Sequence, residues 1–136
     1  MARFLVVAYQ TATSPELVRR LSELAEADPE PTYVTLLVPA REEHPGSEAQ
    51  ARGHADAAAR ILERNAGVHV SWSVIGDAHP MRAIEEELRA LDGEYDAIVL
   101  STLPPGTSRW LELANPEEAA RTLGIPVHHV VAQPVA

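Results

Sequence analysis

The segment YDAIVL, residues 95–100, is an almost continuous apolar run, and the polar segment STLPPGTSRW, residues 101–110, follows it directly. A run of this kind predicts a strand that is buried on both faces of a parallel sheet. RFLVVAY, residues 3–9, has the same character, so we expect both strands at the centre of one sheet. Because many α/β proteins hold phosphate in a small polar loop after such a strand, residues 101–110 are a candidate ligand loop.

Strands and helices alternate along the rest of the chain. Three further strands are predicted at TYVTLLV (32–38), VHVSWSVI (68–75) and VHHVVA (127–132). Four helix starts are indicated by capping residues or an N-terminal proline, at Ser14-Pro15, at Ser47 with Gln50, at GDAHP (76–80) and at Asn115-Pro116. This alternation predicts an α/β protein with a Rossmann-like parallel sheet.

The character of each strand predicts its place in the sheet. Residues 68–75 alternate between apolar and polar, which is typical of an edge strand, and the alternation puts Trp72 on the apolar face and in the core. With right-handed crossovers, we expect an open five-stranded parallel sheet of strand order 3-2-1-4-5, with helices on both faces, in a single domain over residues 1–136. The winding then reverses between the first and fourth strands, and ligands of open α/β sheets bind in the crevice at such a reversal.

Charge and composition exclude several classes of function. The chain has 136 residues, a net charge of −9 and no cysteine, which argues against nucleic-acid or membrane binding and against disulfides and cysteine metal sites. Its 11 basic residues are all arginine, so there is no lysine for a Walker-type loop or a Schiff base. Neither a membrane span nor a signal peptide is recognisable, and a cytoplasmic location is expected.

GDAHPMRAI (76–84) and DAIVLSTLPPGTSRWLELANPEEAARTLGIPVHHVV (96–131), together with the element order, resemble the universal stress protein family over essentially the whole chain. The resemblance implies an adenine nucleotide alpha hydrolase-like fold and an adenine nucleotide, ATP among them, in the crevice. In the family, a loop of the form G-x2-G-x9-G-(S/T) presents backbone N–H groups to the phosphates. The chain departs from this loop, because the glycine positions fall near Ser101, near Leu103 or Pro104, and near Ala114-Asn115.

The residues and the resemblance together indicate one candidate ligand site. Its predicted members lie at the ends of strands or at helix starts: Tyr9, Gln10, Thr11, Ser14, Val38, Gly76, Asp77, Ser101, Thr102, Gly106, Thr107, Ser108, Arg109 and Asn115. Thr107 and Ser108 offer hydroxyls and Arg109 a bidentate fork for a small anion. Asp77 is either a helix cap or an acceptor for a ribose hydroxyl, and His79 belongs either to the crevice or to the capping region of the same helix.

Three functions stay open at this point. The first is a small regulatory or sensor module of the universal stress protein type that binds a nucleotide or another small anion. The second is a protein-interaction module with an empty crevice, because Pro104 and Pro105 have no N–H to offer and the family's aspartate falls near Tyr9 or Gln10. The third is a weak nucleotide hydrolase.

The sequence favours binding over catalysis. No G-x-S-x-G elbow and no H-x-G-H signature occur, and no catalytic residue is assigned. Residues 85–87, EEE, are interpreted as the solvated face of a helix. No metal site is predicted, because His128 and His129 are adjacent in a strand and point to opposite faces.

The last strand predicts a homodimer. Residues 127–132 lie at an edge of the predicted sheet, and an uncovered edge leaves backbone groups without partners. Pairing of this strand with its twofold mate would cover them, and the resemblance implies the same arrangement.

Overall fold

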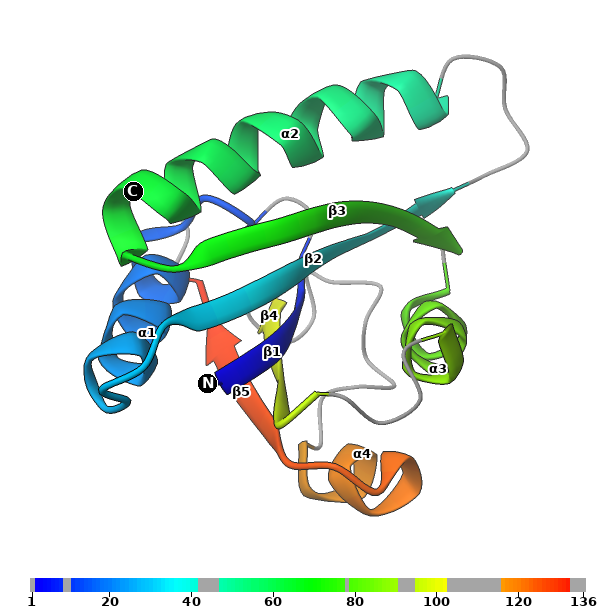
Figure 1. The fold of residues 1–136 in the computed structure, drawn as a ribbon. Helices are drawn as coiled ribbons and strands as arrows, with labels where there is room; N and C mark the ends of the chain where they lie inside the picture. Colours follow the sequence, from blue (N-terminus) through cyan, green and yellow to red (C-terminus); the bar gives the residue numbers. More distant parts are fainter. Residues whose placement is uncertain are drawn as a thin grey trace.

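The computed structural model describes residues 2–8, 11–41, 47–77, 79–90, 95–102 and 116–132 (Figure 1). The elements follow the predicted alternation: β1 (Ala2–Val7), α1 (Pro15–Glu26), β2 (Thr32–Arg41), α2 (Ser47–Ala66), β3 (His69–Asp77), α3 (Pro80–Ala90), β4 (Ala97–Thr102), α4 (Pro116–Leu123) and β5 (Val127–Val131). The main differences from the prediction are at strand ends: β1 ends at Val7 instead of residue 9, and β2 continues to Arg41 instead of ending at residue 38.

The five strands form one parallel sheet of order β3-β2-β1-β4-β5, which confirms the predicted topology. β1 and β4 lie inside the sheet, and every residue of β4 is buried, as its apolar run predicts. β3 and β5 are the two edge strands. Between β1 and β4 the winding reverses, so the carboxyl ends of these two strands face the crevice that the sequence indicates.

Helices cover both faces of the sheet, as predicted (Figure 1). On one face, Leu17 and Leu21 of α1 and the alanine stripe of α2 pack against the sheet. On the other face, Ile84 of α3 and Leu123 of α4 pack against Leu5, Leu37 and other strand residues. Each face of the buried strands is therefore in contact with apolar side chains, which is the main source of stability for a parallel sheet.

Local signals fix the helix ends. Ser14 caps α1, its Oγ accepting a hydrogen bond of 3.2 Å from the N–H of Leu17, and Pro15 is the first helical residue. Gly67, after α2, and Gly124, after α4, have φ of +72° and +73°. Such angles strain any residue with a Cβ, so glycine ends both helices at little cost.

At one point of its pairing with β2, β3 has an extra residue. Val34 pairs with Val70, but the next residue, Thr35, pairs with Trp72. Ser71 is therefore an extra residue in β3, a β-bulge. Because side chains alternate along a strand, one extra residue moves every later side chain to the opposite face.

This bulge overturns the prediction for Trp72. Val70, before the bulge, packs on the α1 and α2 face, whereas Val74, after it, packs on the α3 and α4 face. Trp72 shares the face of Val74 and is 43% exposed, the one exposed large apolar side chain in the described part of the chain. The prediction that Trp72 lies in the core is wrong, because it assumed an unbroken alternation.

The acidic run 85–87 is also not a uniformly solvated face. Glu85 is exposed, but Glu87 is only 9% exposed, and its Oε1 accepts a hydrogen bond of 3.1 Å from the hydroxyl of Tyr95. Burial, together with the Glu87 carboxylate, raises the pKa of Tyr95 well above its ordinary value. Glu87 therefore attaches α3 to the start of β4, and the interpretation of this residue as solvated is wrong.

Two glycines provide a matched test of the packing. A Cβ on Gly76 would lie 2.8 Å from Cδ1 of Leu37 and 2.9 Å from Cβ of Ala83, whereas a Cβ on Gly53 would meet nothing within 4 Å. We expect Gly76→Ala to lower the free energy of unfolding by about 1–3 kcal/mol, because α3 and β2 must move apart. Gly53→Ala, inside α2, should raise it by about 0.5–1 kcal/mol. Urea unfolding measures both, and equal stability of the two variants would contradict the close approach of α3.

Candidate functional site

Two hydroxyls join the loop after β1 to the end of β4. Ser101 Oγ donates a hydrogen bond of 2.7 Å to Thr11 Oγ1, and both residues are buried although they are 90 positions apart in the sequence. The carbonyl of Thr11 also accepts the N–H of Ser14 at 3.0 Å, so the same loop leads directly into the cap of α1. The structure thus brings Thr11, Ser14 and Ser101 together, three of the residues that the sequence indicates for the site.

A second polar pair, a hydroxyl and an imidazole, lies on the opposite face of β4. Thr102 Oγ1 is 2.8 Å from Nε2 of His129, which belongs to β5. Burial lowers the pKa of His129, because a half-buried imidazole is less well solvated when it is charged. Sequence reasoning missed this role for His129. The sequence pattern that bears on this role is the alternation that places His128 and His129 on opposite faces of the strand. This pattern becomes informative only when the register of β5 against β4 is known.

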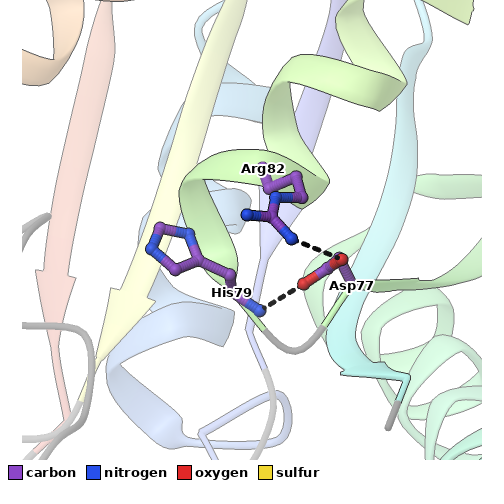
Figure 2. A network of polar contacts seen from close by, with 3 residues as sticks. All are labelled: Asp77, His79 and Arg82. Atoms are coloured by element: carbon purple, nitrogen blue, oxygen red, sulfur yellow. Dashed lines mark hydrogen bonds and ion pairs between the residues drawn. The ribbon is translucent and has the colours of Figure 1, made fainter. Parts of the chain in front are cut away.

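Asp77, the last residue of β3, is held by the amino end of α3 (Figure 2). Its Oδ1 accepts the backbone N–H of His79 at 2.8 Å, and its Oδ2 lies 3.6 Å from Nη1 of Arg82. The carbonyl of His79 accepts the N–H of Ala83 at 3.1 Å, which makes His79 the capping residue of α3. Asp77 is therefore not the cap that the sequence predicted, but it accepts a hydrogen bond from the capping residue His79. Arg82 is a partner that the sequence did not indicate.

Gly76 and Val38 have packing roles. Gly76 allows α3 to approach Leu37, and the side chain of Val38 is fully buried in the core that α1 and α2 cover. These positions shape the end of the sheet, and their side chains are not available to a ligand.

At the amino end of α1, backbone N–H groups are hydrogen-bonded to groups of the chain itself. Ser14 satisfies the N–H of Leu17 through Oγ and that of Val18 through its carbonyl, and Pro15 has no N–H. Glu16 adds a carboxylate in the first turn, where a negative charge interacts favourably with the helix dipole. An anion at this helix end would therefore compete with groups that the chain itself provides.

The remaining predicted site residues lie outside the described part of the chain: Tyr9, Gln10, Gly106, Thr107, Ser108, Arg109 and Asn115. In the described ranges, no group of three or more His, Cys, Asp or Glu side chains could hold a metal ion. No helix in the same ranges has both the length and the apolar character that crossing a membrane requires.

Comparison with known proteins establishes the class of fold. Neither a protein-family model nor a curated protein matches the sequence. Among solved structures, the universal stress protein from Archaeoglobus fulgidus in complex with dAMP is similar with a TM-score of 0.61 and 19% identity, over 96% of this chain and 97% of that chain. A universal stress protein in complex with cAMP gives a TM-score of 0.60 and 16% identity, over 96% and 97% of the two chains.

A universal stress protein family member from Arabidopsis thaliana with AMP bound is also similar, with a TM-score of 0.50, 16% identity and coverage of 97% and 92%. The chain therefore has the universal stress protein fold. This confirms, at the level of fold, the resemblance seen in the sequence. The bound nucleotides are properties of those proteins.

The pairing of Thr11 with Ser101 predicts a measurable stability. Ser101→Ala removes the donor and leaves Thr11 Oγ1 buried, so we expect a loss of about 1–2 kcal/mol in the free energy of unfolding. Thr32→Val is the control, because the buried Thr32 Oγ1 has no hydrogen-bond partner among the described residues and its removal should stabilise the fold by about 1 kcal/mol. Urea unfolding of both variants checks this, and a Ser101→Ala chain as stable as the wild type would show that the pair contributes nothing.

Proposed function

We propose that the chain, as one domain over residues 1–136, is a cytoplasmic regulatory or sensor module of the universal stress protein type. It binds an adenine nucleotide at the carboxyl ends of β1 and β4 and forms a homodimer through β5. The observation that carries the proposal is the fold, because solved structures with this fold hold dAMP, cAMP and AMP.

The site itself supports a small polar ligand. Ser101 and Thr102 place two hydroxyls at the end of β4, and Thr11 adds a third from the loop after the neighbouring strand β1. Hydroxyls at such a position bind ribose or phosphate oxygens, and Arg109, in the segment that follows β4, supplies a charge that pairs with phosphate.

The sequence of that segment favours a monophosphate over a triphosphate. Pro104 and Pro105 stand where the family's loop offers backbone N–H groups, and the chain has no lysine to neutralise further phosphate charges. Ligands with one phosphate need fewer donors, so we expect AMP, dAMP and cAMP to bind more tightly than ATP.

Titration calorimetry with cAMP, AMP and ATP tests the proposal. Ser101→Ala and Arg109→Ala should each weaken monophosphate binding by about tenfold, as expected for the loss of one hydrogen bond to a charged group. Thr32→Val, at the opposite end of the sheet, should leave the affinity unchanged. A wild-type chain that binds none of the three nucleotides would overturn the ligand site and favour an interaction module with an empty crevice.

The two edges of the sheet differ in a way that favours a dimer through β5. Along β3, the bulge at Ser71 interrupts the pairing register, and Nη1 of Arg52 donates a hydrogen bond of 2.7 Å to the carbonyl of Ser73. Bulges and charged side chains of this kind protect an edge from pairing with another strand. β5 has neither device, because its five residues pair with β4 in an uninterrupted register.

The outward groups of β5 can be assigned from the bonds at its two ends. Pro126 O accepts from the N–H of Ile98, and the N–H of Ala132 donates to Thr102 O at 2.9 Å. Because the hydrogen-bonding groups of a parallel strand alternate in direction, those of Val127, His129 and Val131 point away from β4. A second copy could pair with these groups.

Val131→Pro tests the dimer without removing a bond of β5 to β4. Proline lacks the outward N–H of Val131 and is tolerated at the outer side of an edge strand. We expect light scattering at micromolar concentration to show a dimer for the wild type and a monomer for the variant, with unchanged circular dichroism. A monomeric wild-type chain would contradict this part of the proposal.

A further inference from the structure

The hydroxyl of Thr102 and the imidazole of His129 share one hydrogen bond at the end of β4. Thr102 is the last residue of the strand and directly precedes the segment that holds Arg109. Thr102 Oγ1 and His129 Nε2 are 2.8 Å apart, a normal distance for a strong bond between a hydroxyl and a ring nitrogen. His129 reaches this position from β5, where it stands opposite Leu100.

The protonation state of His129 affects which of the two groups donates this hydrogen bond. In a neutral imidazole, Nε2 either accepts the hydroxyl hydrogen of Thr102 or donates its own hydrogen, depending on the tautomer. A protonated imidazole can only donate. Protonation of His129 therefore always leaves the hydrogen of the Thr102 hydroxyl available for another acceptor, and it adds a positive charge beside that acceptor.

Among the described residues, the elements that pack against β5 place no other buried charge beside His129. β4, which pairs with β5, has no charged residue, and among the described side chains of α4 the charged one is Arg121, which is exposed. α1 packs on the opposite face of the sheet, the face of His128. Among the described residues, burial is the cause of the lowered pKa of His129, so the ring is neutral at pH 7 and becomes charged in acid.

We propose that His129 is a positioning residue for the proposed nucleotide site: it sets whether the hydroxyl of Thr102 donates or accepts, and so links the binding of an anionic ligand to the protonation of the imidazole. This inference rests on the proposed function and adds a residue and a pH dependence to it. The affinity for a phosphate ligand should rise as the pH falls, because the ligand's oxygen needs a donor and the protonated pair always provides one.

The experiment uses cAMP, whose phosphodiester keeps one negative charge throughout the range in which histidine titrates. We expect cAMP to bind the wild-type chain more tightly at about pH 5.5 than at about pH 8, by a factor that approaches about ten as the free imidazole becomes fully protonated. His129→Gln and Thr102→Val should lose this pH dependence, whereas Thr102→Ser, which keeps the hydroxyl, should retain it. The matched control is His128→Gln, which changes the neighbouring histidine on the opposite face and should behave as the wild type.

The outcomes separate this inference from the proposed function. If the wild type binds cAMP but His129→Gln shows the same pH dependence, the role of His129 is wrong and the nucleotide site stands. If the wild type binds no cAMP at any pH, the proposed function fails, and the role of His129 fails with it.

A measurement on the wild-type chain avoids any variant that does not fold. By linkage, a ligand that binds more tightly to the protonated form must raise the pKa of His129. We expect nuclear magnetic resonance titration of the imidazole to show a pKa about one unit higher when cAMP is saturating, which corresponds to the tenfold effect. An unchanged pKa of His129 in the cAMP complex would overturn the inference.

Discussion

The pairing of β1 with β4 is the contact on which the rest of the structure depends. Phe4–Val7 lie beside Ala97–Leu100, so residues more than 90 positions apart form the centre of the sheet. Because β4 joins β1 on the side opposite β2, the chain winds one way before this pair and the other way after it. The helices are then divided between the two faces, and the carboxyl ends of β1 and β4 mark the reversal at which open α/β sheets bind ligands. The pairing of these two buried strands therefore determines both the winding of the chain and the place of the candidate site.

Much of this architecture could be predicted from local sequence, and the failures have a common physical cause. Buried apolar runs identify central strands, and Ser14, Gly67 and Gly124 mark helix ends, because these effects act within a few residues. The bulge at Ser71 and the burial of Glu87 depend on partners in other elements, namely the register of β2 and the hydroxyl of Tyr95. A pattern read along one segment contains no information about such partners.

The residues of the candidate site also fall into those that the sequence predicts and those that only the folded chain shows. Thr11, Ser14 and Ser101 were predicted because strand ends and helix caps can be located from sequence, and the structure brings them together. His129 and Arg82 were not predicted, because each acts on a residue of the site through a contact that only the folded chain defines. Asp77 was predicted as a helix cap or an acceptor for a ribose hydroxyl, but its contacts show a carboxylate that supports the capping residue His79 and lies close to Arg82.

The polar groups at the end of the sheet are already satisfied within the chain. Thr11 is bonded to Ser101, Thr102 to His129, and Asp77 to the amino end of α3. Where a ligand displaces one of these internal hydrogen bonds, only the difference between the old bond and the new one adds to its affinity. This favours ligands that match several of these groups at once and gives an affinity that responds to any change in one partner. These internal partners also keep the end of the sheet hydrogen-bonded in the absence of a ligand.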